Sequence, residues 1–469
     1  MNELHADVVV VGAGPTGLML AAELRLAGVD AVVVERLPER TGLSKALNLQ
    51  PRTAEVLDLR GLLPRAEERA FATVQEGHFA VIPVSYAGWD TPHPYQLGIP
   101  QARVEDLLEE RFAELGGKVL RGHELGSLTQ DDEGVRAVAG ELVLRGRYLV
   151  GCDGGRSTVR KLLGVPFEGD DGSGYGVVAD VVVDRVPDGA AGTWTSVRGM
   201  VRSAGPTGFC GLIPLDEPLL YRLTFGDRAH RPANFRDPVT ADEVHEAFAA
   251  TYGPAAIREI RWLSRFSDAS RLAARYRTGR VLLAGDAAHI HFPAGGQGLN
   301  LGVQDAMNLG WKLAAAVRGD SSVLDSYETE RRAVGAAVLE NVAAQNGLIP
   351  QSTSSRALRA LFTTLADLPD VSRHLSGLVS GLAIHYPAPA DAHPLTGARL
   401  PDFRLPDGSW ASTLFHAGHH VLLRTPGADL SALPHVPGPL STTDLPALPF
   451  PSAAALLRPD GHFSWLPSH

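Results

Sequence analysis

Cysteine is almost absent from this chain of 469 residues, which contains only Cys152 and Cys210. Two cysteines so far apart exclude a disulfide framework, and the cytoplasm is the compartment that we expect. No run of 18 consecutive apolar residues occurs, so the sequence predicts no membrane span. The first residues include the acidic Glu3 and Asp7 and no basic leader region, so we predict no signal peptide.

Positive charge is also scarce, because 43 lysines and arginines face 53 acidic residues, a formal net charge of −10. Nucleic acid and anionic membrane surfaces are therefore not expected as partners. Apolar residues make up 44% of the chain and charged residues 20%, which is typical of a soluble globular protein. The length allows two to four domains with a large core.

Residues 6–36 show the pattern of a strand, a glycine turn, a helix and a second strand. ADVVVVG is a continuous apolar run, typical of a parallel strand that is covered on both faces. GPTGLMLAAELRLAG has the spacing of a helix that ends at Gly28, and AVVVERL is the second strand. The sequence therefore predicts one βαβ unit with a G-x-G-x-x-G turn inside it.

This glycine turn predicts a dinucleotide site. The first glycine allows the tight turn, the second lets the backbone approach a pyrophosphate, and the third lets helix and strand pack closely. The free amides and the positive end of the helix then bind the phosphates. Glu35 ends the second strand, where an acid accepts hydrogen bonds from a ribose, and Arg36 follows it. The alternative is a merely structural turn. The predicted cofactor contacts in this unit are Gly12, Gly14, Pro15, Thr16, Gly17, Glu35 and Arg36.

The character of the chain changes along its length. A β-rich stretch interrupts the α/β pattern, long helical patterns follow it, and the last part is rich in proline and glycine with short strand-like pieces. We predict an α/β protein: a Rossmann-like nucleotide-binding domain, an inserted β-sheet domain for the substrate and a small C-terminal domain. The predicted boundaries are 1–171 and 266–390 for the two parts of the nucleotide-binding domain, 172–265 for the insert and 391–469 for the C-terminal domain. Helices are expected at 51–63 and 103–117, among others.

Two further motifs follow predicted strand ends and identify the dinucleotide. CDGGRS occupies residues 152–157, and GDAAH at 285–289 is followed by PAGGQGLN at 293–300. Together with the glycine turn, they resemble the three motifs of the single-component flavoprotein aromatic hydroxylases, the p-hydroxybenzoate hydroxylase-like group. The resemblance covers essentially the whole chain and is strongest to the subgroup of aromatic-polyketide hydroxylases and rifampicin monooxygenases. It implies a thioredoxin-like fold for 391–469, without thiol chemistry because this segment contains no cysteine.

The resemblance implies an extended, noncovalently bound FAD with its adenosine near Glu35. Asp286 matches the acid that hydrogen-bonds the ribityl chain, and Asp153 matches a position linked to FAD and NAD(P)H binding. Capping of the following turn is the alternative for both aspartates. Lys45 stands where the family usually has arginine, and a lysine cannot offer a planar fork to phosphate. The other matched cofactor positions are Gln101, Gly298, Leu299 and Asn300.

Elementary physics favours a flavin at 293–300 independently. A reduced flavin carries negative charge near N1 and the C2 carbonyl, and a helix that begins near 297 directs its amides and positive end at that charge. Small residues leave room for a flat ring against the backbone. The sequence identifies no catalytic base. We therefore assign catalysis to the positioning turn formed by Pro293, Gly295 and Gly296.

The resemblance implies hydroxylation of a polycyclic, polyketide-type aromatic molecule. NADPH or NADH would reduce FAD, O₂ would add to form a C4a-hydroperoxide, and the distal oxygen would be transferred to the substrate. The single glycine fingerprint leaves the nicotinamide to bind transiently in a groove. Baeyer–Villiger oxidation, oxidation without oxygen insertion, and a non-catalytic drug-sequestering flavoprotein remain open. We expect a monomer or homodimer.

Recognition of a large substrate needs a second surface, because the glycine-rich turn has few side chains. The insert provides that surface, and Phe209, Gly211 and Tyr221 are candidates for its inward face. The glycine-rich segment leaves open which of the three point inward. His289 and His291 form an H-x-H pair, but no carboxylate or cysteine is spaced to complete a metal site, so we predict none.

Overall fold

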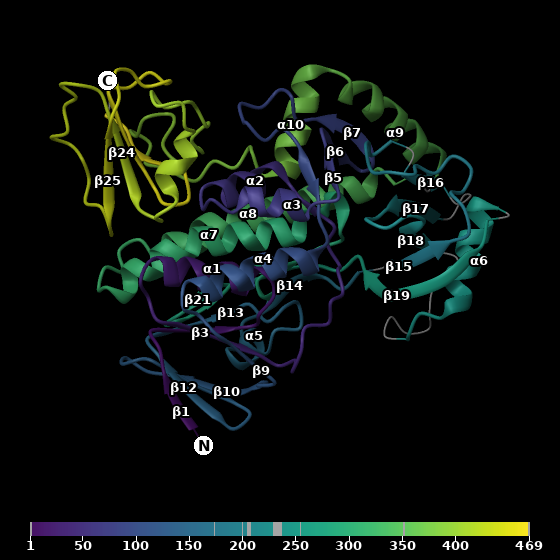
Figure 1. The fold of residues 1–469 in the computed structure, drawn as a ribbon, viewed down its shortest axis with the longest axis horizontal. Coiled ribbons are helices and arrows are strands. Elements are labelled where there is room, and N and C mark those ends of the chain that lie inside the picture. Colours follow the sequence, from purple (N-terminus) through teal and green to yellow (C-terminus); the bar gives the residue numbers. More distant parts are fainter. Residues whose placement is uncertain are drawn as a thin grey trace.

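The computed structural model describes residues 2–172, 174–198, 200–203, 208–227, 237–253, 255–349 and 352–467. Its framework is a six-stranded sheet in the order β21-β22-β13-β2-β3-β9 (Figure 1). The predicted βαβ unit is confirmed, because β2 pairs in parallel with β3 and all four valines of β2 are buried. The strands are β2 (Val8–Val11), β3 (Ala31–Glu35), β9 (Val119–Arg121), β13 (Tyr148–Gly151), β21 (Arg277–Thr278) and β22 (Val281–Leu283).

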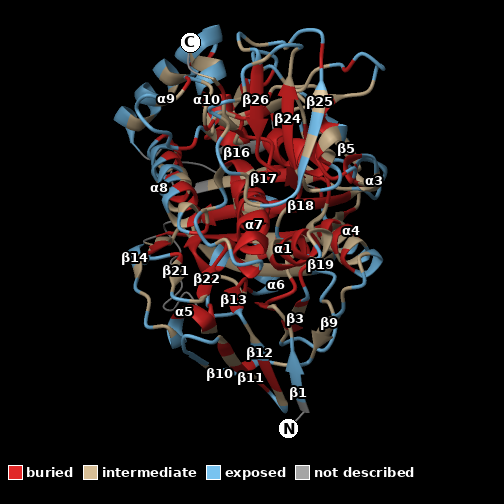
Figure 2. Cartoon of the chain, turned by 90° about the vertical axis from the view of Figure 1, so that its left-hand side faces the viewer, coloured by how far each residue is buried: buried red, intermediate tan, exposed pale blue. Residues whose placement is uncertain are grey.

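Two helices pack together at the centre of the molecule. α1 (Pro15–Leu26) follows the glycine turn and begins with a proline, where no hydrogen-bonding amide is needed. It packs against α7 (Gln297–Val317), which is buried along nearly its whole length (Figure 2). α4 (Gln101–Glu114) lies against α1, and α8 (Ser326–Gly347) lies against α7. Within the described part of the chain, no helix is both long and apolar enough to span a membrane.

A second, five-stranded sheet has the order β16-β17-β18-β15-β19 and lies to one side of the first (Figure 1). One of its faces packs under α6 (Ala241–Tyr252) and has a core of its own. The predicted β-rich character of this stretch is confirmed, although β19 was not predicted. Residues 173, 199, 204–207, 228–236 and 254 of the predicted insert lie outside the described residues. The strands are β15 (Tyr175–Val183), β16 (Val201–Ser203), β17 (Gly208–Pro214), β18 (Leu220–Asp227) and β19 (Ile257–Ser267).

The last part of the chain forms a four-stranded sheet in the order β25-β24-β26-β27. β24 (His420–Arg424), β26 (Ala454–Leu457) and β27 (Phe463–Trp465) coincide with the strand-like pieces of the sequence. β25 (Leu440–Asp444) was missed, because this edge strand buries none of its residues and its sequence shows no apolar face.

The predicted helix at 51–63 is wrong in its extent. It is divided into α2 (Pro51–Asp58) and α3 (Leu63–Arg69), since Gly61 has a φ of +66° that ends the first helix. The other principal elements are β1 (Asn2–His5), β4 (Asn48–Leu49), β8 (Gln96–Gly98), β10 (Leu125–Gln130), β11 (Val135–Ala139), β12 (Leu142–Gly146), α5 (Thr158–Leu162), α9 (Thr353–Ala366) and α10 (Pro369–Ser380).

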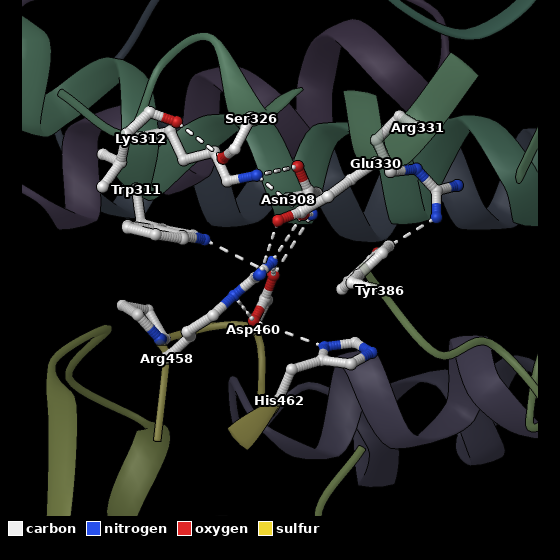
Figure 3. Close-up of polar contacts among 12 residues, drawn as sticks. Asn308, Trp311, Lys312, Ser326, Glu330, Arg331, Tyr386, Arg458, Asp460 and His462 are labelled. Atoms are coloured by element: carbon white, nitrogen blue, oxygen red, sulfur yellow. Dashed lines mark hydrogen bonds and ion pairs between the residues drawn. The ribbon is translucent and has the colours of Figure 1, made fainter. Parts of the chain in front are cut away.

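Buried charges join the C-terminal sheet to α7 and α8 (Figure 3). Arg458, just after β26, donates to both carboxylate oxygens of Glu330 at 2.8 and 2.9 Å and to Asp460 at 2.5 Å. Lys312 of α7 donates to Glu330 at 2.7 Å. Burial would raise the pKa of Glu330, but Arg458 and Lys312 lower it to about 2. Burial lowers the pKa of Lys312 to about 7, against the attraction of Glu330. We call these four residues the charge cluster.

Candidate functional site

The three glycines of the first turn have different surroundings. Gly12 has a φ of +106°, and a Cβ there would lie 2.4 Å from the carbonyl oxygen of Cys152. A Cβ on Gly17 would lie 2.0 Å from the carbonyl oxygen of Gly12. A Cβ on Gly14, in contrast, would have nothing within 4 Å. Packing therefore requires the first and third glycines, whereas the second leaves an open surface at the start of α1, where a phosphate would bind.

Thr16 packs against the GDAAH turn and against α7. A Cβ on Gly285 would lie 2.5 Å from its Oγ1, and a Cβ on Gly302 would lie 2.3 Å from it. The hydroxyl of Thr16 thus occupies space that these glycines leave, between α1, the GDAAH turn and α7. Pro15 is the first residue of α1, and the first turn of this helix has neither a side-chain cap nor an acid.

Glu35 closes the glycine turn with its half-buried carboxylate. Its Oε2 accepts a hydrogen bond from the amide of Ala13 at 2.9 Å, and its Oε1 accepts one from the amide of Leu37 at 3.0 Å. Each carboxylate oxygen has a second acceptor site, so the group is free to bind ribose hydroxyls as well. Arg36 is exposed beside it.

The turn at 293–296 forms a surface without side chains at the start of α7. Gly295 and Gly296 have φ values of +72° and +63°. A Cβ on Gly296 would lie 2.2 Å from Oδ1 of Asn48, so this residue must be glycine. α7 has no side-chain cap and no acid in its first turn. Its first amides and positive end are thus available to an anionic ring. Pro293 is exposed, and Gly298 and Leu299 are half-buried.

Buried amide side chains hold this turn in place. Asn300, which is 2% exposed, accepts a hydrogen bond from the amide of Gln50 at 2.7 Å and donates to the carbonyl of Gly296 at 2.9 Å. Gln50 donates to the carbonyl of Gly295 at 2.7 Å and accepts from the hydroxyl of Tyr86 at 2.7 Å. Asn48 donates to Gln96 at 2.8 Å. We call Asn48, Gln50, Tyr86, Gln96 and Asn300 the amide network.

Only Asn300 of the amide network was identified from the sequence. Its partners on β4, on β8 and at position 86 lie more than 200 residues away from it along the chain, so no local pattern connects them. The one available signal was the occurrence of Asn48 and Gln50 on either side of the apolar Leu49, where a buried strand must satisfy its polar groups.

The GDAAH turn presents Asp286 at the carboxyl end of β22. Asp286 is exposed, and the turn is fixed by Asp305 of α7, which accepts hydrogen bonds from the amide of Gly285 at 3.1 Å and from His289 at 2.7 Å. Asp305 also accepts from Arg331 at 2.7 Å. Burial opposes ionisation of Asp305, but Arg331 and His289 lower its pKa. His289 therefore serves this ion pair. No group of three or more acidic, histidine or cysteine side chains suited to a metal occurs among the described residues.

Asp153 caps a helix. Its carboxylate accepts hydrogen bonds from the hydroxyl of Ser157 at 2.5 Å and from the amides of Thr158 and Val159 at 2.6 and 3.1 Å, at the start of α5. These contacts fit the capping alternative, while contact with FAD or nicotinamide stays a prediction.

Lys45 lies in the loop before β4, and Gln101 is the first residue of α4. The side chain of Lys45 is exposed, and its carbonyl accepts a hydrogen bond from Arg222 of β18 at 3.0 Å. Gln101 accepts from the amide of Ala46 at 3.3 Å. Arg222 is 2% exposed and pairs with Asp180 at 2.6 Å. No sequence pattern predicted this arginine, which connects the second sheet to the loop that contains Lys45.

The face of the second sheet opposite α6 points at the turn. Phe292, which precedes the turn, packs against Phe209 of β17 and Phe266 of β19, with ring centroids 6.5 and 5.6 Å apart. In the antiparallel ladder, Gly211 is two residues from Phe209 and shares its face. Of the three candidates, Tyr221 does not lie on this face, because it is buried in the core under α6. A one-residue difference in position along a strand reverses the face.

The arrangement fits FAD. Gly14 leaves the space that a pyrophosphate needs, Glu35 retains acceptor sites for a ribose, and Asp286 is exposed at the next strand end. The bare start of α7 suits a flavin ring. These features lie along one side of the six-stranded sheet, at the carboxyl ends of β2, β3 and β22.

Comparisons with known proteins agree. Residues 5–342 match the family described as FAD binding domain. An anhydrotetracycline monooxygenase of Streptomyces rimosus is 45% identical over 98% of this chain and 95% of its own length. A rifampicin monooxygenase of Streptomyces venezuelae is 40% identical over 98% of this chain and 95% of its own length. The solved anhydrotetracycline hydroxylase of Streptomyces rimosus, at 42% identity, superposes with a TM-score of 0.87 over 99% of this chain and 96% of that chain. This chain therefore belongs to the FAD-binding domain family, and it is an FAD-dependent monooxygenase.

Proposed function

We propose that the protein uses NADPH or NADH to hydroxylate a polycyclic, polyketide-type aromatic molecule. The observation that carries this proposal is the contact between Phe292, next to the cofactor turn, and Phe209 and Phe266 of the second sheet. This contact brings a face with aromatic side chains to the place where a flavin ring fits. Relatives named for anhydrotetracycline and rifampicin support the substrate class.

The overall reaction would consume O₂, one NAD(P)H and one proton, and convert an aromatic C–H to C–OH with release of water and NAD(P)⁺. Bound FAD supplies the electron transfer and the oxygen activation. In this proposal Gly12 to Gly17 and Glu35 bind the cofactor, and Lys45, Gln101, Asp153 and Asp286 contact it. Pro293, Gly295 and Gly296 orient the ring, while the amides at Gly298 to Asn300 stabilise negative charge on it.

The same proposal gives each part of the chain a role. Residues 1–171 and 266–390 form the domain that binds FAD noncovalently, residues 172–265 form the substrate domain, and residues 391–469 form a thioredoxin-like domain away from the substrate. The parallel pair β24–β25 beside antiparallel β26 and β27 is compatible with the thioredoxin-like assignment. We further infer a monomer or homodimer that acts in the cytoplasm on small molecules.

The central experiment measures NAD(P)H oxidation by the purified yellow holoenzyme with and without polycyclic phenols, anhydrotetracycline among them. A product heavier by one oxygen atom, with the new hydroxyl on an aromatic carbon, supports hydroxylation. An oxygen inserted into the ring would instead indicate Baeyer–Villiger oxidation. Binding without ligand-dependent NAD(P)H oxidation would indicate a sequestering protein and would contradict the proposal.

The substrate face has its own test. Phe209→Ala should raise the KM for the aromatic substrate several-fold or change the hydroxylated position, while the Kd for FAD stays the same. Tyr221→Phe is the matched control, since it removes only the hydrogen bond from the Tyr221 hydroxyl to the carbonyl of Ala191 on the other face. Equal changes of the substrate KM in the two variants would contradict the proposal that the face with Phe209 binds the substrate.

A further inference from the structure

A half-buried imidazole lies beside the cofactor turn. His291 lies two residues before Pro293, and its Nδ1 hydrogen-bonds the carbonyl of Phe292 at 2.7 Å. A carbonyl only accepts, so Nδ1 carries the proton and Nε2 presents its lone pair. Nε2 is buried and has no hydrogen-bond partner among the described residues. An unpaired acceptor of this kind is costly unless a ligand satisfies it.

The Nε2 atom of His291 lies beside the first turn of α7. Apart from the chain neighbours of Gly298 and the backbone of α7, Nε2 is the one described atom within 4 Å of the position that a Cβ would occupy on Gly298, at 3.9 Å. It therefore borders the open side of the α7 N-terminus. The next residue, Phe292, packs on Phe209 and Phe266, so His291 directly precedes the residue that contacts the aromatic face of the second sheet.

The imidazole is held in its neutral form. Burial and His289 lower the pKa of His291, whereas the hydrogen bond to Phe292 and the charge of Asp286 oppose this change. His289 is itself bound to Asp305, so it is not free to take the same role. Asp286 is the acidic group near His291, and it would stabilise the imidazolium that forms if Nε2 gains a proton.

Building on the proposed function, we propose that His291 is a catalytic proton acceptor for a phenolic hydroxyl of the substrate. As oxygen is transferred to the ring, the O–H bond of the phenol breaks and its electron pair moves into the ring. The proton passes to Nε2, whose lone pair forms the new N–H bond, and later leaves to solvent. A positioned base of this kind contributes about 10²–10⁴-fold to rate.

Holoenzymes carrying His291→Phe and His291→Gln test this role. His291→Phe removes the acceptor, so kcat should fall about hundredfold. The acid limb of the pH–rate profile should disappear. His291→Gln keeps a hydrogen-bond acceptor that takes no proton, so phenol affinity should stay near the wild-type value while kcat falls as in His291→Phe. His245→Gln, on the exposed side of α6, is the matched control and should leave both quantities unchanged.

An equilibrium measurement complements the rates. Binding of 2-naphthol and anhydrotetracycline to oxidised holoenzyme, followed by the flavin difference spectrum, should weaken as pH falls in the wild type. In His291→Phe the affinity should be lower by up to about tenfold and independent of pH. The Kd for FAD and the melting temperature should match the wild type.

Two results would overturn the inference and leave the proposed function intact. One is an active wild type whose kcat and acid limb survive in His291→Phe. The other is a rise in the Kd for FAD without a change in phenol binding, because Nε2 would then serve the cofactor. A wild type that oxidises no phenol contradicts the proposed function itself, and this inference with it.

Discussion

The two ends of α7 are built from different chemistry. At its N-terminal end the turn 293–296 is held by neutral groups, the amide network, in which each bond joins an amide, a hydroxyl or a carbonyl. Toward its C-terminal end the helix meets the charge cluster, in which Lys312, Glu330, Arg458 and Asp460 are all buried. Both sets are buried and both join distant segments, but only one of them carries charge.

The difference reflects what each end must do. A reduced flavin brings negative charge to the N-terminal end, and fixed charges there would compete with the amides that stabilise it. The charge cluster meets no ligand in the proposed function, and buried ion pairs with several partners fix one geometry strongly. The comparison therefore separates a ligand-binding end from a structural end of the same helix.

The largest effect is expected when the charge cluster is broken. Arg458→Ala leaves Glu330 and Asp460 buried without their main partner, so the free energy of unfolding should fall by about 3–5 kcal/mol. Urea unfolding followed by circular dichroism measures this loss. Arg424→Ala removes an arginine of the same sheet from its exposed pair with Asp444, and it should change stability by no measurable amount. Equal losses in the two variants would contradict the structural role of the charge cluster.

The second-largest effect is expected at low pH, where the charge cluster should lose part of its contribution to the free energy of unfolding. The pKa of Glu330 is lowered from 4.5 to about 2 in the folded protein, so the unfolded chain binds the proton first as the pH falls. The stability that Glu330 provides is complete above pH 4.5 and is lost as the pH approaches 2, by about 3 kcal/mol. Unfolding free energies between pH 5 and 3 should fall more steeply in the wild type than in the double variant Lys312→Met/Glu330→Gln. If the unfolding free energy fell equally steeply with pH in both proteins, Glu330 would not be the source of the acid sensitivity.

Glu35 tests whether cofactor binding relies on a charge outside α7. Glu35→Ala removes charge-assisted hydrogen bonds worth about 1.5–3 kcal/mol, so the Kd for FAD should rise about ten- to hundredfold. The fold should survive, because the bonds to Ala13 and Leu37 are half-exposed. Glu35→Gln keeps a hydrogen-bond acceptor, so its Kd for FAD should lie between the values of the wild type and of Glu35→Ala. Flavin fluorescence titration measures the Kd, and an unchanged value in Glu35→Ala would remove this residue from the cofactor site.

At the neutral end of α7, the expected loss of stability is smaller than at the charge cluster. Asn300→Leu leaves the Gln50 amide without its acceptor, at a cost of about 1–3 kcal/mol. Because the turn loses its support, the Kd for FAD should rise about tenfold. Gln304→Met, one turn further along α7, is the matched control, since the Gln304 amide makes a long hydrogen bond to the hydroxyl of Thr53, at 3.5 Å, and takes no part in the amide network. If Gln304→Met weakened FAD binding as much as Asn300→Leu, the amide network would have no special connection to the cofactor.

The elements that were predicted from the sequence are those with local causes. Gly17 is dictated by a close contact with Gly12 inside the βαβ unit, Gly12 has the positive φ of a tight turn, and α7 has a long apolar pattern of its own. β19 was missed because most of its residues are only half-buried, which weakens alternation. The sequence left open which of Phe209, Gly211 and Tyr221 point inward, because the glycine-rich segment around β17 does not determine the strand register.

The site residues that were missed depend on distant partners. Gln50 meets Gly295, and Arg222 meets Ser44 and Lys45, across roughly 180 to 250 residues of chain. His291 was noticed only as half of an H-x-H pair, and its role as a free acceptor became visible once His289 was found bound to Asp305. Motifs predicted where the cofactor binds, and only the packed structure identified what holds it.

The order of strands in the six-stranded sheet has a consequence for synthesis on the ribosome. β13 ends at Gly151, yet its neighbour β22 begins only at Val281. At about 5–20 residues per second, one edge of the nascent sheet stays unpaired for roughly 7 to 26 seconds. The buried side of α1 waits longer still, until α7 has emerged. During that interval the growing chain exposes an unpaired strand edge and an apolar helix face. We therefore expect a chaperone to bind the nascent chain during synthesis.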